Sequence, residues 1–253
     1  MKDTLRQVFV ILTVLATLIV NVLANALPLN GLNTGQISDR FHVYFVPAGY
    51  VFSIWGVIYI GLIAYAVYQA LPSQRENPRL RQTGYLAALS GLANITWLFL
   101  WHYEQFPLTL VAMLALLGLL IAIYLRLGIG RKRASMAETW AVRIPFSIYL
   151  GWITVATVAN VTSVLDYAKW SGFGIPPETW MLIILAVVLV IAALVSLTRR
   201  DLAYNLVILW ALAGIAIKHS AVALVANASW VTVALVAVAL ALVLLSHKPA
   251  LKE

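Results

Sequence analysis

Long apolar stretches separated by short polar segments recur along the whole chain. Each stretch has roughly the 20 residues that a helix needs to cross the hydrocarbon core of a membrane. None alternates between apolar and polar residues as the strands of a transmembrane barrel do. The pattern therefore predicts an all-α polytopic membrane protein with about eight membrane-spanning helices. The predicted spans are 8–27, 47–70, 84–101, 107–127, 140–165, 179–198, 202–218 and 228–246.

Composition supports this class of protein and excludes others. The 253 residues are 63% hydrophobic and 10% charged, whereas soluble domains carry about 45–50% apolar and about 25% charged residues. One soluble core could not bury so much apolar surface, which excludes a soluble enzyme, a disordered tail and a nucleic-acid-binding module. The chain has no cysteine, so disulfides, thiolate catalysis and thiolate metal sites are excluded as well.

The net charge of +8 is divided unevenly between the two sides of the predicted topology. An even number of spans places both termini and the loops 71–83, 128–139 and 199–201 on one side. Only Arg40, Lys169 and Lys218 fall on the other side. Since Lys and Arg mark cytoplasmic loops, we expect both termini in the cytoplasm, with the chain in a membrane such as the bacterial cytoplasmic membrane. The basic side holds Lys2, Arg6, Arg75, Arg79, Arg81, Arg126, Arg131, Lys132, Arg133, Arg199, Arg200, Lys248 and Lys252.

Two further features concern the organisation of the chain. The first 26 residues also fit a signal peptide that ends at Ala24-Asn25-Ala26, an alternative that would leave the rest of the topology unchanged. Before about residue 175 the spans carry many Trp, Tyr, Asn and Pro residues, and after it they are mostly Ala, Val, Leu and Ile. We therefore divide the chain into a ligand-binding bundle, 1–170, and a three-helix C-terminal membrane extension, 171–253.

Three predicted helices each carry an aromatic face at helical spacing. Aromatic rings with an amide beside them suit a large, flat, mostly apolar ligand, because the rings stack on its faces while the amide bonds its polar edge. We take these faces as the candidate ligand-binding residues. They are Phe52, Trp55 and Tyr59 in the second span, Asn94 and Trp97 in the third, and Tyr149, Trp152, Ala156 and Asn160 in the fifth.

Simpler interpretations apply to other polar and aromatic residues. Trp140, Trp170, Trp180 and Trp230 fit interface anchors, and Trp101 is ambiguous because it ends its helix. Intramembrane amides such as Asn21 and Asn205 often only join helices. We expect Arg143 to snorkel to the interface and Asp201 to cap the helix that follows it. We predict no catalytic residues and no metal site, since the four His residues lack metal-ligand spacing.

Three segments resemble the translocator-protein family, also called tryptophan-rich sensory proteins (TspO/MBR). Pro47-Ala-Gly-Tyr-Val-Phe52-Ser-Ile-Trp55-Gly-Val-Ile-Tyr59 is similar to the signature that opens the second helix of that family. Ala93-Asn94-Ile-Thr-Trp97-Leu-Phe99 resembles a segment of its third helix, and Tyr149-Leu-Gly-Trp152-Ile-Thr-Val-Ala156-Thr157-Val-Ala-Asn160 a segment of its fifth. The resemblance covers residues 8–165. Ala48 and Tyr50 depart from the signature, as does Ile148 just before the third segment.

The resemblance implies a five-helix translocator-protein-like bundle with three additional transmembrane helices. It implies a ligand cavity between helices, covered by the loop 28–46 on the non-cytoplasmic side. The implied ligand is a porphyrin or other tetrapyrrole, with no obligatory cofactor. The implied roles are transport, reception and, in some bacterial members, light-dependent porphyrin breakdown.

Three functions compete at this point. The first is a membrane receptor or carrier for a tetrapyrrole-like small molecule. The second is a structural or accessory subunit of a larger membrane complex, for example one that contains pigments; a homodimer is also compatible with the sequence. The third is a secondary transporter, which the lack of mid-span carboxylates and of paired broken helices disfavours.

Overall fold

The computed structural model describes residues 2–27 and 29–246, and it is helical throughout, with no strand in that part of the chain. The long helices are α1 (Lys2–Ala26), α3 (Ile54–Ala70), α4 (Pro78–His102), α5 (Phe106–Leu127), α7 (Ile144–Tyr167), α8 (Pro177–Arg199), α9 (Leu202–Lys218) and α10 (Ala223–Leu245). The short elements are η1 (Leu29–Gly31), α2 (Thr34–Ser38), η2 (Gly49–Ser53), η3 (Pro72–Gln74), α6 (Met136–Glu138), the π-helical turn η4 (Thr139–Arg143) and η5 (Gly172–Gly174).

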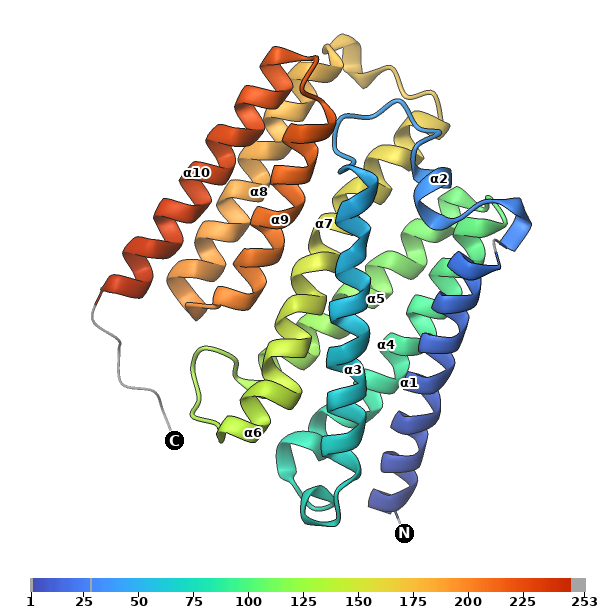
Figure 1. Ribbon diagram of the computed structural model, residues 1–253, viewed down its shortest axis with the longest axis vertical. Helices are drawn as coiled ribbons and strands as arrows, with labels where there is room; N and C mark the ends of the chain where they lie inside the picture. The colour runs from blue at the N-terminus through green and yellow to red at the C-terminus, as the bar shows by residue number, and fades with distance from the viewer. Residues whose placement is uncertain (1, 28, 247–253) are drawn as a thin grey trace.

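The predicted fold class is confirmed. Seven segments of the described chain contain a helix that is long and apolar enough to cross a membrane. The remaining predicted span corresponds to α9, which is apolar but has only 17 residues. It belongs to the same group of helices as α8 and α10 (Figure 1) and packs mainly on α10 and α7.

Local sequence accounts for where several helices begin and end. Proline occupies the first or second position of α4, α5, α7 and α8, where its missing N–H has no helical partner to lose. Gly128 ends α5 with φ of 62°, a left-handed conformation that suits glycine. Pro145 follows η4, and the backbone N–H of Ile144 bonds the carbonyl of Thr139, five residues back.

The helices form two groups (Figure 1). Helices α1, α3, α4, α5 and α7 make a bundle, in which α4 packs between α1 and α5, and α7 packs against α5 and α3. Helices α8, α9 and α10 pack on one another, and α9 joins them to α7 and to η2. The second group is therefore attached to the first mainly through one short helix.

A buried carboxylate, that of Asp201, stabilises the junction between the two helix groups, which we call the Asp201 joint. Asp201 is 7% exposed and caps α9 by accepting from the backbone N–H of Tyr204 at 3.1 Å, as expected from the sequence. Its other oxygen accepts from the hydroxyl of Tyr124 on α5 at 2.9 Å and from that of Ser147 on α7 at 2.6 Å. One side chain thus connects three helices of the two groups.

The expectation that Arg143 snorkels into the interface is wrong. Its side chain is 8% exposed and pairs with Glu138 at 3.1 Å. It also donates to the backbone carbonyls of Lys132 and Arg133 at 2.6 and 3.1 Å. Because α6 and η4 bring Glu138 back toward Arg143, the protein supplies the counter-charge and acceptors that water would otherwise provide.

The segment 29–46 crosses one end of the bundle, with α2 lying above α1 and α4 (Figure 1). Its polar side chains attach it to the surrounding helices: Arg40 pairs with Glu104, and Asp39 with Lys218. The hydroxyl of Tyr44 donates to Glu178 at 2.8 Å, and this hydrogen bond raises the pKa of Tyr44. The segment is therefore fastened to both helix groups.

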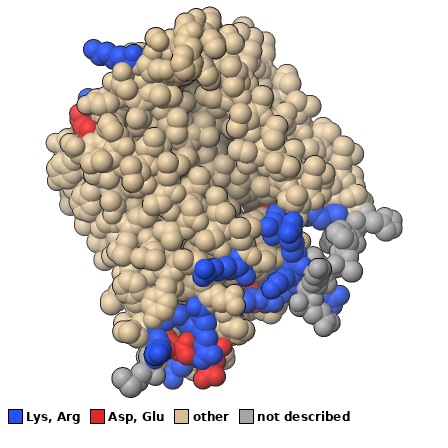
Figure 2. All heavy atoms as spheres, turned by 180° about the vertical axis from the view of Figure 1, so that it is seen from behind, with Lys and Arg blue, Asp and Glu red and all other residues tan. Residues whose placement is uncertain are grey.

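Basic side chains gather at the opposite end. Figure 2 shows nearly all the Lys and Arg of that view at one end of the molecule. Helix α1 begins at this end, and α10 runs toward it (Figure 1). Two cations of the sequence-based charge count, Lys248 and Lys252, lie outside the described residues.

The charge asymmetry generates a prediction about orientation. In intact cells, a cysteine introduced by Ser73→Cys should be protected from an impermeant thiol reagent, whereas one introduced by Ser171→Cys should be labelled. Both serines are exposed, and they lie on opposite sides of the predicted topology. The chain has no cysteine of its own, so labelling reports only the introduced residue; the reverse pattern would contradict the orientation.

The Asp201 joint generates a second prediction. Asp201→Ala removes the cap of α9 and leaves two buried hydroxyls without their acceptor, so the free energy of unfolding should fall by about 3 kcal/mol or more. Asp39→Ala is the matched control, because it breaks the pair at the other end of α9, where Asp39 is 58% exposed. The free energy of unfolding should fall by less than about 1 kcal/mol in this control. Thermal unfolding in detergent measures both, and equal effects would contradict the role of the joint.

Candidate functional site

The aromatic faces of α3, α4 and α7 converge on one cavity. It lies within the five-helix bundle, below segment 29–46, which contributes Thr34 and Ser38 to its lining. Seven of the nine candidate residues line it: Phe52, Trp55, Asn94, Trp97, Trp152, Ala156 and Asn160. The cavity volume is about 50 Å³, well below the roughly 300–1,000 Å³ of ligand pockets.

The cavity is small because the rings pack against one another. Trp152 meets Trp55 and Phe52 edge-on, with ring centroids 6.2 and 5.7 Å apart. Trp97 stacks on Trp101 with centroids 5.4 Å apart and an interplanar angle of 20°. These are favourable aromatic geometries, so the contacts among the rings stabilise the packing of the three faces.

The two candidate amides also join helices. Asn160 accepts from the indole N–H of Trp97 at 3.1 Å and donates to Thr109 at 2.8 Å, which links α7 with α4 and α5. The side-chain oxygen of Asn94 accepts from Asn21 at 2.7 Å and so links α4 with α1. For Asn21, the interpretation as an interhelical contact agrees with this geometry.

One hydrogen-bond donor in the cavity lining, the buried Nε1 of Trp152, has no partner among the described residues. The amide of Asn94, in contrast, lies beside the hydroxyl of Tyr149 as well as the amide of its partner Asn21. A buried donor without an acceptor costs roughly 1–3 kcal/mol. A ligand that presented a carbonyl or carboxylate oxygen to the Trp152 indole would recover that cost.

A larger space adjoins the cavity. This groove has a volume of about 670 Å³ and lies between α1, α2, α3 and α4. Phe52, Trp55 and Trp97 line both the groove and the cavity, so these three rings form the partition between the two spaces. Near the basic end, α1 and α3 are held together by mutual side-chain-to-backbone hydrogen bonds of Gln7 and Gln69, at 2.6 and 3.2 Å.

The structure places the remaining candidates outside the cavity lining. Tyr59 lines the adjoining groove and stacks on Trp55 with centroids 5.7 Å apart. Tyr149 is 1% exposed and packs edge-on against Trp55, but it lines neither space. Its side chain therefore lies behind the lining residues Trp55 and Asn94.

Several lining residues were absent from the sequence-based set. Trp101 shares the face of Asn94 and Trp97, but its place at the end of its helix left its role ambiguous. It is 3% exposed and donates to the carbonyl of Thr34 at 3.2 Å. Helix α5 supplies Met113 and Leu116, and nothing in its uniformly apolar sequence distinguishes them. His102, which is fully buried, fastens segment 29–46 by a contact of 3.1 Å between Nε2 and the Thr34 hydroxyl.

Helix α9 of the C-terminal group contacts η2, the short helix that carries Phe52. The indole of Trp210 on α9 donates to the carbonyl of Val51 at 3.1 Å. The backbone N–H of Ala48 donates to the carbonyl of Gly214 at 3.2 Å. A Cβ at Gly214 would lie 2.2 Å from the Val51 side chain, so only glycine permits this approach. Helix α9 thus holds η2, whose Phe52 lines the cavity.

Fold and cavity together define a polytopic helical membrane protein with an aromatic-lined space inside its bundle. The family comparison is more specific. Residues 7–245 match the family model described as TSPO-like protein, so the chain belongs to this family. The match continues through α10, well beyond the residues 8–165 covered by the three motifs. No curated protein and no solved structure matches the chain.

Proposed function

We propose that this protein is a membrane receptor or carrier that binds a planar hydrophobic ligand, a porphyrin or another tetrapyrrole. The observation that carries the proposal is the convergence of three aromatic helix faces on one cavity that also holds the unpartnered indole N–H of Trp152. Rings of this kind stack on a flat apolar ligand. The indole N–H of Trp152 would bond a polar substituent of the ligand.

Binding requires the partition to move. The cavity of about 50 Å³ is too small for a tetrapyrrole, whereas the neighbouring groove of about 670 Å³ is within the range of ligand pockets. We propose that the ligand enters the groove, contacts Tyr59 and Trp55, and displaces the rings of Phe52, Trp55 and Trp97. Groove and cavity would then form one site beneath segment 29–46.

We propose binding without catalysis. Among the described residues, the cavity lining contains no carboxylate, histidine or lysine, and these are the side chains that most often transfer protons in enzymes. The groove lining adds one carboxylate, that of Asp39, which is paired with Lys218. By the charge asymmetry, we also propose that the basic end faces the cytoplasm and that segment 29–46 faces the opposite side.

A specific observation favours a second function. The aromatic faces pack closely against one another, which is what a purely structural role would require. Helix α10 also exposes large apolar side chains along its length, among them Val231, Val238 and Leu242. A structural or accessory subunit of a larger membrane complex is therefore the alternative, and co-purification within such an assembly would support it.

The proposal predicts that Trp152→Ala weakens porphyrin binding by roughly tenfold to a hundredfold. Trp152 contacts two other lining rings and carries the unpartnered donor of the cavity lining, and a fully desolvated aromatic anchor commonly contributes 2 kcal/mol or more. Quenching of protein fluorescence during titration with protoporphyrin in detergent measures the affinity.

Trp180→Ala is the matched control. Trp180 lies on α8, donates to the carbonyl of Gly172 at 2.9 Å and lines neither the cavity nor the groove. Its loss should leave the affinity within about twofold, provided that both variants remain monodisperse. If the two substitutions weakened binding equally, the cavity assignment would be wrong.

A further inference from the structure

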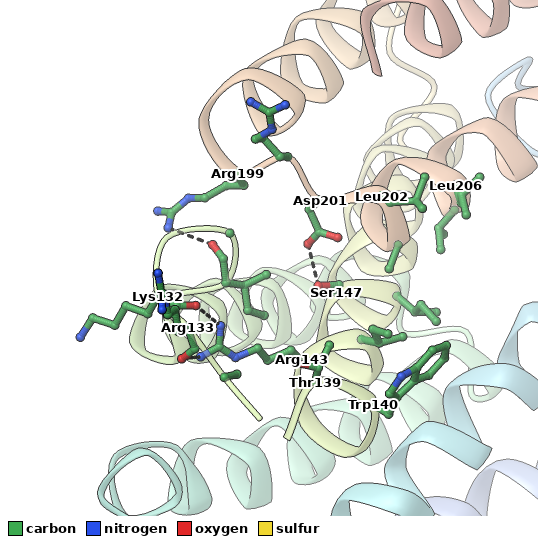
Figure 3. Close-up of a pocket in the computed structure, with 18 of the residues that line it drawn as sticks. Lys132, Arg133, Thr139, Trp140, Arg143, Ser147, Arg199, Asp201, Leu202 and Leu206 are labelled. Atoms are coloured by element: carbon green, nitrogen blue, oxygen red, sulfur yellow. Dashed lines mark hydrogen bonds between the residues drawn. The ribbon is translucent and has the colours of Figure 1, made fainter. Parts of the chain in front are cut away.

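A second cavity, of about 870 Å³, lies at the junction of the two helix groups (Figure 3). Its lining comes from the loop that joins α5 to α6, from η4 and α7, and from the turn between α8 and α9 together with α9 itself. It shares no lining residue with the aromatic cavity or its adjoining groove. The proposed tetrapyrrole site does not use it.

One side of this cavity is strongly basic. Five cationic side chains and a single carboxylate line it. The carboxylate is that of Asp201, which is already engaged by two hydroxyls and a backbone N–H. Arg143 is paired with Glu138, but the other four cations still outnumber the one carboxylate, so a net positive charge lies at the mouth of the cavity. The cations are Lys132, Arg133, Arg143, Arg199 and Arg200.

Two of these cations are available to a ligand. Lys132 and Arg133 are exposed, and neither side chain has a hydrogen-bond or ion-pair partner in the described part of the chain. Their backbone carbonyls are held by Arg143 at 2.6 and 3.1 Å, so the loop that presents them is fixed in place. Arg143 thus acts as a positioning residue for its neighbours.

The loop also approaches the α8–α9 turn closely. Gly130 has φ of 75°, and a Cβ there would lie 1.8 Å from the carbonyl oxygen of Arg199. The guanidinium of Arg199 lies over the ring of Tyr124, 5.7 Å from its centroid. These contacts bring the cation of the turn to the same mouth as those of the loop, as Figure 3 shows for Arg199, Lys132 and Arg133.

The other side of the cavity is apolar and open. In Figure 3, Leu202, Leu206 and Trp140 lie opposite the cationic side chains. Trp140, Leu206 and Trp210 are 64%, 52% and 39% exposed. In a chain embedded in a membrane, exposed apolar side chains on a spanning helix face lipid. The second cavity therefore has a cationic mouth on one side and an apolar, lipid-facing surface on the other.

We infer that this cavity binds an anionic glycerophospholipid. The phosphate of the headgroup would lie between Lys132, Arg133 and Arg199. An acyl chain would follow α9 along Leu202 and Leu206 toward Trp210. Basic pockets between transmembrane helices on the cytoplasmic side suit anionic headgroups, and the adjoining bilayer supplies the ligand. A bound lipid would also fill the space beside Asp201 and so stabilise the junction of the two helix groups.

Native mass spectrometry of the full chain in nonionic detergent tests this inference. The probes are phosphatidylglycerol and phosphatidylcholine with identical acyl chains. We expect one phosphatidylglycerol to remain bound per chain, with at least a tenfold preference over phosphatidylcholine. The double substitution Lys132→Gln and Arg133→Gln should weaken that binding by roughly tenfold or more, because each basic residue adds to the attraction for an anionic headgroup.

Two further variants distinguish binding in this second cavity from attraction to the basic surface in general. Arg131→Gln removes an exposed cation of the same loop that does not line the cavity, so binding should change by less than about threefold. Leu206→Trp fills the apolar side without changing any charge and should weaken binding as strongly as the double substitution. Because Leu206 is more than half exposed, this substitution should leave the fold intact.

Three results would overturn the inference. Equal losses for Arg131→Gln and the double variant would show attraction to the basic surface alone. Unchanged binding in Leu206→Trp would show that the acyl chain does not lie along the apolar side of the second cavity. Displacement of the lipid by soluble glycerol phosphate at similar concentrations would identify a site for a free anion. None of these results bears on porphyrin binding, so the two proposals fail independently.

Discussion

The buried carboxylate of Asp201 is the constraint on which the arrangement of the two helix groups depends. A charge in a low-dielectric interior must be surrounded by hydrogen-bond donors or it destabilises the fold. Asp201 finds its donors on α5, on α7 and in the first turn of α9. Once α9 is fixed at that end, Gly214 and Trp210 further along it meet Ala48 and Val51. The start of the second span is thereby held, and with it Phe52 in the cavity.

This dependence changes how the C-terminal helices are understood. Their Ala- and Val-rich sequences indicate packing, and α8 and α10 do pack mainly on each other and on α9. Helix α9, however, is both the attachment of this group and the outer support of η2, and it forms one wall of the basic cavity. The extension is therefore structurally coupled to the five-helix bundle. That coupling agrees with a family match that runs from residue 7 to residue 245.

Much of this could be predicted from the sequence, because its physical signals are strong. Apolar length defined the spans, and helical spacing brought Trp55, Trp97 and Trp152 to one cavity. What could not be predicted depends on contacts between distant segments. Met113 lines the cavity only because of how α5 is rotated, and Tyr149 misses it for the same reason on α7. The size of the cavity depends on how rings pack, which spacing does not encode. Arg143 was misread because its neutralisation requires the π-helical turn that returns Glu138 to it.

The central claim is that the converging aromatic faces hold a planar ligand within the bundle, and the Soret absorption of a porphyrin tests it most directly. Protoporphyrin should be added to the full-length protein in mild detergent and the spectrum compared with that in empty micelles of the same detergent. A ligand stacked between rings experiences an environment different from that of a micelle. The account predicts a shifted Soret band whose amplitude saturates at one porphyrin per chain. A spectrum identical to that in empty micelles at every protein concentration would contradict it.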